Sequence, residues 1–192
     1  MARHKEYDEK EVLQKAMELF RYQGYEKTSL QDLVSHMGIH RRSLYDTFGD
    51  KHSLFIKALE LYDNNMKKKL NLQVKNSLSA KDAIRGMLES VISQDNEKSI
   101  GCLTVNTAIE LALHDQEVAE KVEQNFAKTE EIIHELLVRG QNTGEISNNH
   151  DIEKLSQFIH NSFVGLRVLT KTTNDKNKLK NIVDMTLSIL EK

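Results

Sequence analysis

The stretch MGIHRRSLYDTFGDKHSLF, residues 37–55, decides the fold of the amino-terminal part of this chain. Leu44 and Phe48 are four residues apart, so a short helix near residues 40–47 places both side chains on one buried face. The preceding helix is predicted to end at Gly38, which leaves a turn of three or four residues between the two helices. Two helices joined by so short a glycine-containing turn indicate a helix-turn-helix motif. The alternative for this region is a generic unit of three packed helices.

The residues that this orientation turns away from the core are suited to DNA recognition. The planar fork of an arginine such as Arg42 can bond guanine O6 and N7 together, and the start of a recognition helix usually meets the base edges. The hydroxyl of Tyr45 can reach a phosphate, while Lys51 and the first amides of neighbouring helices offer further phosphate anchors. The basic tail at residues 2–5 is a further predicted contact to the minor groove or the backbone. The predicted DNA-binding residues are Thr28, His40, Arg41, Arg42, Ser43, Tyr45, Asp46, Thr47 and Lys51.

Two features of this surface leave its chemistry open. Arg42 and Asp46 are four residues apart and can form an exposed ion pair worth about 0.2–0.5 kcal/mol. Asp46 can instead orient Arg42 or accept a hydrogen bond from a cytosine amine. Residues 1–55 contain nine Lys/Arg and nine Asp/Glu, so the motif rather than net charge supports DNA binding.

Composition favours a protein built only from helices. The 192 residues include no proline and are 39% hydrophobic and 29% charged, an ordinary globular balance. No apolar run approaches the roughly 18 residues of a membrane span, and no apolar stretch typical of a secretory signal follows the first basic residues. A single cysteine, Cys102, excludes an intramolecular disulfide and suits the reducing cytoplasm, which is the expected location.

Helical periodicity continues almost from end to end and predicts an all-α fold of nine helices, without a competing strand pattern. The predicted helices cover residues 8–24, 28–38, 40–47, 51–74, 79–94, 102–113, 115–139, 152–171 and 176–190. Capping signals mark four of the starts. These signals are the pair Thr28 and Gln31, Asp50, the pair Ser79 and Asp82, and Asp115.

The spacing A-x-x-L-F-x-x-x-G-Y-x-x-T-S-L-x-D-L, followed by M-G-I-x-x-x-S-L-Y-x-x-F-x-D-K-x-S-L-F, resembles the amino-terminal domain of TetR-family transcriptional regulators. The match runs from Ala16 to Phe55. One departure affects base preference: the family often has an aromatic residue and a histidine where this chain has Asp46 and Thr47. The segment SIGCLTVNTAIELALH, residues 99–114, also looks like the carboxy-terminal domain of an AcrR-like, ligand-responsive branch of these regulators.

The resemblance implies that residues 1–50 form the helix-turn-helix DNA-binding domain and residues 51–192 a helical effector-binding and dimerisation domain. It further implies a homodimeric repressor that binds a palindromic operator in double-stranded DNA and is released by a small-molecule, oxidant or electrophile inducer. By the same analogy, the last two helices build a four-helix dimer interface. Apolar residues spread so widely round these helices that two packing partners are required. The predicted interface includes Phe158, Gly165, Leu166, Leu169, Ile182 and Leu187.

The prediction of an effector site depends on one stripe of residues and on the expected architecture. Cys102, Asn106 and Glu110 recur at every fourth position and so lie along one side of the sixth helix. Cys102 is either a redox or electrophile sensor or a small buried residue, and the other two either line a pocket or hydrogen-bond inside the core. Pockets in helical bundles lie between helices. The predicted pocket comprises Tyr62, Met66, Met87, Cys102, Asn106, Glu110, Phe126 and Phe163.

Other classes of function find no support in the sequence. It contains no phosphate-cradling glycine loop, nucleophile elbow or sensible Cys-His-Asp arrangement, so enzyme activity is not expected. His36 and His40 are separated by Gly38 and no zinc-binding motif is present, so neither a metal nor another cofactor is expected. The remaining alternative is a helical protein-interaction module without sequence-specific DNA binding, which would leave the outward-facing arginines unexplained.

Overall fold

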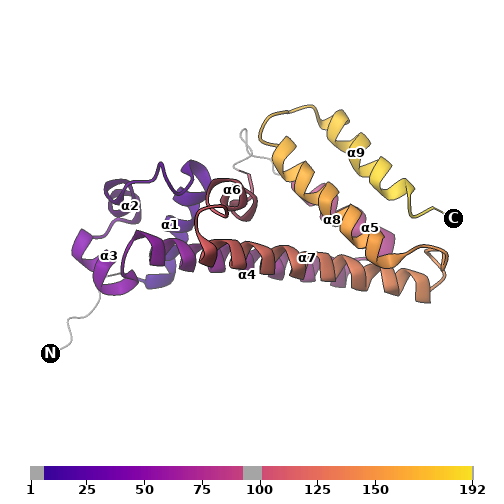
Figure 1. The fold of residues 1–192 in the computed structure, drawn as a ribbon, viewed down its shortest axis with the longest axis horizontal. Coiled ribbons are helices and arrows are strands. Elements are labelled where there is room, and N and C mark those ends of the chain that lie inside the picture. Colours follow the sequence, from indigo (N-terminus) through magenta and orange to yellow (C-terminus); the bar gives the residue numbers. More distant parts are fainter. Residues whose placement is uncertain (1–6, 93–100, 192) are drawn as a thin grey trace. The chain divides into compact units, whose positions relative to one another are not determined.

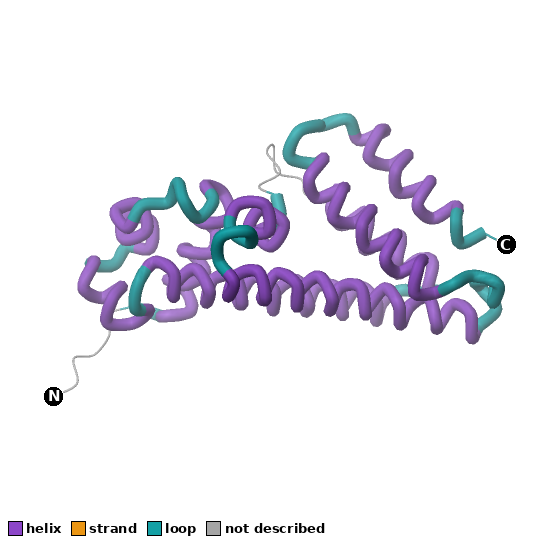
Figure 2. Tube along the Cα trace, viewed as in Figure 1, coloured by secondary structure: helices purple, strands orange, loops and turns teal. Residues whose placement is uncertain are grey.

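The computed structural model describes residues 7–92 and 101–191, and over these ranges the chain forms nine helices and no strand. The predicted all-α fold is therefore confirmed, and Figure 2 shows the loops that connect its helices. None of the described helices combines the length and the apolar character required to cross a membrane. In chain order, the helices in Figure 1 are α1 (Glu9–Gln23), α2 (Leu30–Met37), α3 (Arg41–Phe48), α4 (Lys51–Asn76), α5 (Ala80–Ile92), α6 (Leu103–Glu110), α7 (Gln116–Asn142), α8 (Ile152–Leu169) and α9 (Lys176–Ser188).

The chain divides into two compact units. The first unit comprises Met1–Met66 and Cys102–Ala119, and the second comprises Lys67–Gly101 and Glu120–Lys192. The first unit therefore contains α6 together with α1, α2 and α3, and α6 contacts α1 directly. The domain boundary expected after residue 50 stays a prediction.

The spacing of apolar residues explains how the first helices pack. On α1, Ala16 and Phe20 are four residues apart and both are fully buried. The ring of Phe20 packs edge-on against Phe55 of α4, with the ring centroids 5.0 Å apart. Leu33 of α2 and Leu44 of α3 are also fully buried, so one apolar core holds the first three helices together.

The start of α2 corrects one predicted capping signal. The N-cap residue is Ser29, whose hydroxyl accepts from the Asp32 amide at 3.1 Å, while the Asp32 carboxylate accepts from the Ser29 amide at 3.0 Å. The predicted pair Thr28 and Gln31 is wrong, because the Thr28 hydroxyl is buried and donates to the carbonyl of Gly24 at 2.5 Å. Two neighbouring hydroxyl residues were both able to cap this helix, and the packing of Thr28 selects Ser29.

The other predicted helix starts are confirmed. The carboxylates of Asp50 and Asp115 each accept from the amide three residues further on, at 2.7 and 3.1 Å, and so cap α4 and α7. The hydroxyl of Ser79 does the same for α5 at 3.1 Å. Helix α5 has a second cap from a distant residue, because Glu145 accepts from its first two amides at 2.9 and 2.8 Å.

In the second unit, α5, α8 and α9 pack against one another around a shared apolar core. Leu166 of α8 and Leu187 of α9 belong to this core and are only 0% and 8% exposed. Their predicted place in a dimer interface is therefore corrected, since both side chains already pack within their own subunit. Sequence periodicity did not distinguish the inward apolar positions of these helices from the outward ones.

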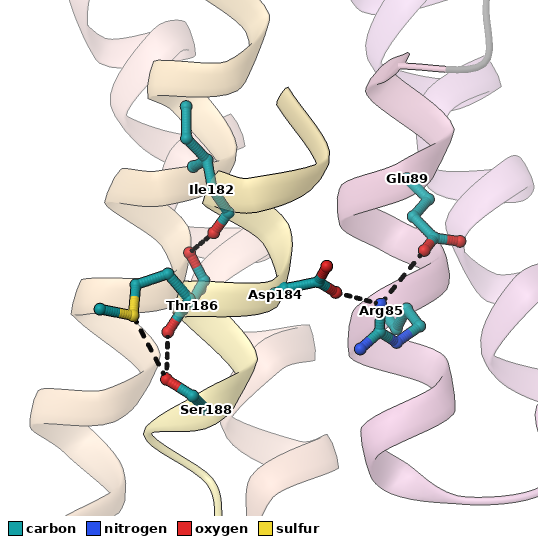
Figure 3. A network of polar contacts seen from close by, with 7 residues as sticks. Arg85, Glu89, Ile182, Asp184, Thr186 and Ser188 are labelled. Atoms are coloured by element: carbon teal, nitrogen blue, oxygen red, sulfur yellow. Dashed lines mark hydrogen bonds and ion pairs between the residues drawn. The ribbon is translucent and has the colours of Figure 1, made fainter. Parts of the chain in front are cut away.

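A polar contact also fastens α9 to α5. The guanidinium of Arg85 donates to Asp184 at 2.7 Å and to Glu89 at 3.4 Å (Figure 3). The hydrogen bond from Arg85 to Asp184 is the first cause of the raised pKa of that guanidinium. Because all three side chains are well exposed, this contact between α5 and α9 adds little stability.

Candidate DNA-binding surface

Helix α3 buries its apolar face and presents a polar face to solvent, as predicted. Leu44 is 0% and Phe48 is 4% exposed. The side chains of Arg42 and Asp46 are 90% and 68% exposed on the opposite side of the helix. His40, the N-cap residue of α3, is exposed as well and its side chain makes no capping hydrogen bond.

Arg42 and Asp46 form the exposed ion pair that was one of the alternatives for these residues. Nε of Arg42 lies 3.7 Å from Oδ2 of Asp46. A pair so exposed contributes about 0–1 kcal/mol, so DNA can displace the carboxylate at small cost. The pair therefore leaves the Arg42 guanidinium available for base recognition and keeps it on the outward face.

Arg41 and Tyr45 form a second contact on one flank of α3. Nη2 of Arg41 donates to the Tyr45 hydroxyl at 3.4 Å, and its guanidinium carbon lies 5.8 Å from the centre of the tyrosine ring. Tyr45 is 43% exposed. This flank thus offers a cation and a hydroxyl side by side, a suitable combination for a phosphate or a base edge.

The other flank of α3 is held by a residue that the sequence did not single out. The hydroxyl of Tyr7 lies 2.6 Å from Oγ1 of Thr47 and donates to the main-chain carbonyl of Ser43 at 3.3 Å. No local spacing links residue 7 to a helix that begins more than 30 residues later. The hydroxyl of Thr47, a predicted DNA-binding group, is therefore already paired within the protein.

Lys51 and Asp50 define the start of α4. Nζ of Lys51 lies 4.2 Å from the centre of the Tyr25 ring, a cation–π contact. The pKa of Tyr25 is raised, mainly because the side chain is partly buried. The hydrogen bond from the Ser53 amide lowers the pKa of Asp50, so this carboxylate is ionised and occupies an amide that was expected to face a phosphate. The predicted phosphate anchor here is reduced to the Lys51 ammonium and the remaining first amides of α4.

Thr28 does not belong to the exposed surface. Its side chain is 0% exposed, so any contact of Thr28 with DNA is restricted to the backbone amides near it, and its place among the DNA-binding residues stays a prediction. The backbone amides beside it remain candidate phosphate anchors. Asp32 lies at this helix start as an ionised cap, because hydrogen bonds from Ser29 lower the pKa of its carboxyl.

Glu110 forms hydrogen bonds with the loop between α1 and α2. Its carboxylate, at the carboxyl end of α6, accepts from the amides of Tyr25 and Glu26 at 3.0 and 2.8 Å. The nearby Gly24 has φ of 85°, and a side chain there would begin 2.9 Å from Glu110 Oε2. These bonds favour the alternative that Glu110 hydrogen-bonds within the protein, and they fasten α6 to the loop between α1 and α2; its place in a pocket stays a prediction.

A second carboxylate beyond the end of α6 contacts α4. Oδ2 of Asp115 lies 2.7 Å from Nε2 of His52. The bond from the Val118 amide and that from His52 lower the pKa of Asp115, which keeps the carboxylate ionised. From one short segment, Glu110 thus binds the α1–α2 loop and Asp115 binds the start of α4. The rings of Tyr25 and His52, one from each of these two regions, pack edge-on with their centroids 6.5 Å apart.

The remaining predicted pocket residues are divided between the two units. Those in the first unit are Tyr62, Met66, Cys102 and Asn106, and those in the second are Met87, Phe126 and Phe163. Met87 and Phe163 line an apolar space with no room for a water molecule, so these two side chains fill the core of the second unit. Cys102 is 3% exposed, which favours a small buried residue over a sensor.

One titratable residue in the second unit lies in an unusual environment. The ring of His160 is 12% exposed and packs edge-on against Phe126, with centroids 5.4 Å apart. Its Nδ1 lies 3.6 Å from Glu130. Burial lowers the pKa of His160 more than this carboxylate raises it, so the neutral imidazole is favoured. Within the described residues, no three His, Cys, Asp or Glu side chains are grouped so that they could hold a metal ion.

The predicted dimer residues other than the two core leucines lie nearer the surface. Phe158 is 48% exposed, and a side chain at Gly165 would meet no atom within 4 Å. Leu169 and Ile182 are partly exposed. Met185 of α9, which the sequence prediction omitted, is 72% exposed.

An all-α fold with a short helix-turn-helix that presents two arginines to solvent is typical of a DNA-binding transcriptional regulator. Comparison with known proteins places it within that class. The model for bacterial regulatory proteins of the tetR family matches residues 12–58, and the model for the tetracyclin repressor-like C-terminal domain matches residues 80–186. The chain belongs to the tetR family of bacterial regulatory proteins, which are transcriptional regulators rather than enzymes. Regulators of this family act as dimers, and a small-molecule effector is typical of them.

Individual relatives agree with this assignment. The uncharacterized HTH-type transcriptional regulator YezE of Bacillus subtilis is 37% identical over 100% of both chains. The HTH-type transcriptional repressor ComR of Escherichia coli is 28% identical over 97% of this chain and 90% of its own. A cysteine variant of the TetR-family regulator CifR, solved with 26-bp double-strand operator DNA, superposes with a TM-score of 0.88 at 26% identity, covering 98% of this chain and 100% of CifR.

Proposed function

We propose that the chain is a homodimeric repressor that reads a palindromic operator through α3 and is released from it by a small-molecule inducer. The exposed face of α3 carries this proposal, since Arg41, Arg42 and Tyr45 lie outward while Leu44 and Phe48 anchor the helix in the core. An arginine on such a helix can bond one guanine through two hydrogen bonds. Because chromosomal DNA is the target, the proposed location is the cytoplasm.

The relatives support repression and operator binding. ComR is named as a repressor, and CifR has been solved with operator DNA in the same fold. The basic segment at residues 2–5, proposed as a minor-groove or backbone contact, lies outside the described residues. Residues 1–50 are the proposed DNA-binding domain and residues 51–192 the proposed effector and dimerisation domain.

The outer faces of α8 and α9 are the proposed dimer interface. Phe158, Val168 and Met185 are 48%, 39% and 72% exposed, which is unusual for large apolar side chains on neighbouring helices of one unit. Leu169 and Ile182 are partly exposed, and Gly165 has open space around it for close approach. A dimer places two copies of α3 in successive major grooves, about 34–36 Å apart.

The route from the effector to DNA is proposed to include α6. In the first unit, Glu110 and Asp115 hold the α1–α2 loop and the start of α4, so a shift of this segment would move the helices that carry the DNA-binding surface. For the inducer to act, it must bind the released state more tightly than the DNA-bound state. Tyr62, Met66 and Asn106 remain proposed pocket residues.

Selection from a randomised duplex pool at two salt concentrations tests the proposal. The expected result is a palindrome with two half-sites, bound with an affinity that falls steeply as salt rises. A folded, dimeric protein that enriches no sequence would refute operator binding. It would favour the alternative, a helical protein-interaction module, which predicts no retained sequence at either salt concentration.

A further inference from the structure

The contact between Tyr7 and α3 joins the beginning of the chain to the proposed DNA-reading helix. The phenol oxygen of Tyr7 lies 2.6 Å from Oγ1 of Thr47 and 3.3 Å from the main-chain oxygen of Ser43. Ser43 and Thr47 are one helical turn apart, so a single hydroxyl holds two successive turns of α3. One of the two bonds is to the backbone and does not depend on a side chain of α3.

Tyr7 is itself fixed in place by the start of α1. The next residue, Asp8, is the N-cap of α1, and its side chain accepts from the Lys10 amide at 2.8 Å. Helix α1 packs on α2, and α2 packs on α3. Tyr7 therefore adds a direct polar link from the start of α1 to α3, alongside the apolar core that joins the same helices.

Helix α3 needs such support because little else in its sequence stabilises it. It has only eight residues, and isolated helices of that length are not stable in water. The His40 side chain at its N-cap makes no capping hydrogen bond, and its first turn has no acidic residue. Leu44 and Phe48 hold one face in the core and so set the rotation of the helix broadly, while contacts on its flanks restrain it further.

We propose that Tyr7 is a positioning residue for DNA recognition: its hydroxyl fixes the rotation of α3 and thereby the direction in which Arg42 points. The inference rests on the proposed reading of DNA by α3. Functional side chains have to be held within about 0.5 Å of their productive positions by such supporting hydrogen bonds. Sequence-specific binding depends on this placement, whereas non-specific attraction to phosphates depends mainly on charge.

The proposal assigns Thr47 a role different from base reading. Its hydroxyl faces Tyr7 within the protein, and the residue is only partly exposed. Thr47 then acts as the partner of Tyr7 in holding α3. If Thr47 instead read a base directly, its contribution to DNA affinity would be independent of Tyr7.

The test compares Tyr7→Phe, Thr47→Val and the double variant with the wild-type full-length chain. The probes are the duplex that the wild type retains from the random pool and a scrambled duplex of equal length. Tyr22→Phe is the matched control, because Tyr22 is 67% exposed on α1 and loses the same hydroxyl. Thermal unfolding and hydrogen exchange of the α3 amides are measured on the same proteins.

Tyr7→Phe is expected to weaken binding to the selected duplex about 3- to 10-fold, and binding to the scrambled duplex by less than about 2-fold. Thr47→Val should weaken binding to the selected duplex no more than Tyr7→Phe, because it keeps the bond from Tyr7 to the Ser43 carbonyl. The double variant should bind no more weakly than Tyr7→Phe. Exchange of the α3 amides should become faster, and Tyr22→Phe should match the wild type in every measurement.

Four results would overturn the proposal. Equal weakening on both duplexes together with a lower unfolding temperature would make Tyr7 a structural residue only. Additive losses in the double variant would make Thr47 an independent DNA contact. Unchanged binding by Tyr7→Phe, while the wild type still selects a palindrome, would refute the role of Tyr7 and leave the operator-binding proposal intact; failure of the wild type to select any duplex would remove both.

Discussion

Replacing Gly24 with alanine is expected to break the contact between Glu110 and the loop that leads into α2. The backbone at Gly24 has φ of 85°, and the new methyl carbon would lie 2.9 Å from Oε2 and 3.1 Å from Oε1 of Glu110. The flexible carboxylate can move away, but it then gives up its bonds to the amides of Tyr25 and Glu26. The substitution therefore carries two costs, one from the backbone and one from Glu110.

The structure gives a magnitude for each cost. Holding a non-glycine residue in this region of φ costs about 1–3 kcal/mol. Hydrogen bonds to a charged group contribute about 1.5–3 kcal/mol, and the lower end applies here because the bond to the Glu26 amide is exposed. Gly24→Ala should thus reduce the free energy of unfolding by about 2.5–5 kcal/mol, and Glu110→Ala alone by about 1–2 kcal/mol. Since both variants lose the same bonds, the double variant should be no less stable than Gly24→Ala.

Urea unfolding at one fixed protomer concentration measures these differences, because the stability of a dimer depends on concentration. Gly38→Ala is the matched control: its φ is 70°, but no atom lies within 4 Å of the added carbon. It should cost about 1–2 kcal/mol and add fully to Glu110→Ala. If Gly24→Ala and Glu110→Ala also add within about 0.5 kcal/mol, the two residues are not coupled and the reasoning fails.

Three further predictions concern the proposed DNA contacts, the buried histidine and the proposed dimer interface. Arg42→Ala should weaken binding to the selected duplex by about 1–3 kcal/mol and remove the base preference at one position of the operator. Lys51→Ala should weaken binding to all duplexes alike and reduce the salt dependence of binding by about one phosphate contact. If both variants weaken binding to all duplexes equally in titrations, the separation into a base contact and a phosphate contact is refuted. For His160, whose pKa is lowered by burial, the unfolded state takes up a proton first as pH falls, so stability should decrease from about pH 7 to 5. His160→Gln should flatten the pH dependence of the free energy of unfolding over this range, as measured by urea unfolding at a series of pH values. An unchanged slope would contradict the lowered pKa of His160. Phe158→Ala should weaken self-association in sedimentation with little change in subunit packing, whereas Leu166→Ala should reduce the free energy of unfolding by about 2–5 kcal/mol; the reverse pattern would move the interface elsewhere.

Features that depend on neighbouring residues could be predicted from the sequence. The four-residue spacing of Leu44 and Phe48 determined which face of α3 is buried, because helical geometry fixes that relation without reference to the rest of the chain. Asp50 and Asp115 were recognised as caps for the same reason, since a cap bonds an amide only three residues away. The error at Thr28 arose where two adjacent residues had equal capping ability.

Contacts between distant segments could not be predicted in this way. Glu110 lies 85 residues from the amide of Tyr25, and Tyr7 lies 40 residues from Thr47. Carboxylates and phenols form such bonds with many partners, so their identity in the sequence does not indicate which partner lies near. Only the packing of α6 and of the start of α1 against the DNA-binding helices selects these pairs.

The same distinction separates the inward and outward residues of the last two helices. The sequence by itself determined that α8 and α9 are apolar round most of their circumference, and hence that they have more than one packing partner. The tertiary structure decided that Leu166 faces the subunit's own core while Phe158 remains exposed. The physical reason is that periodicity fixes the angle between side chains on one helix, whereas the rotation of that helix depends on the shape of the core it packs against.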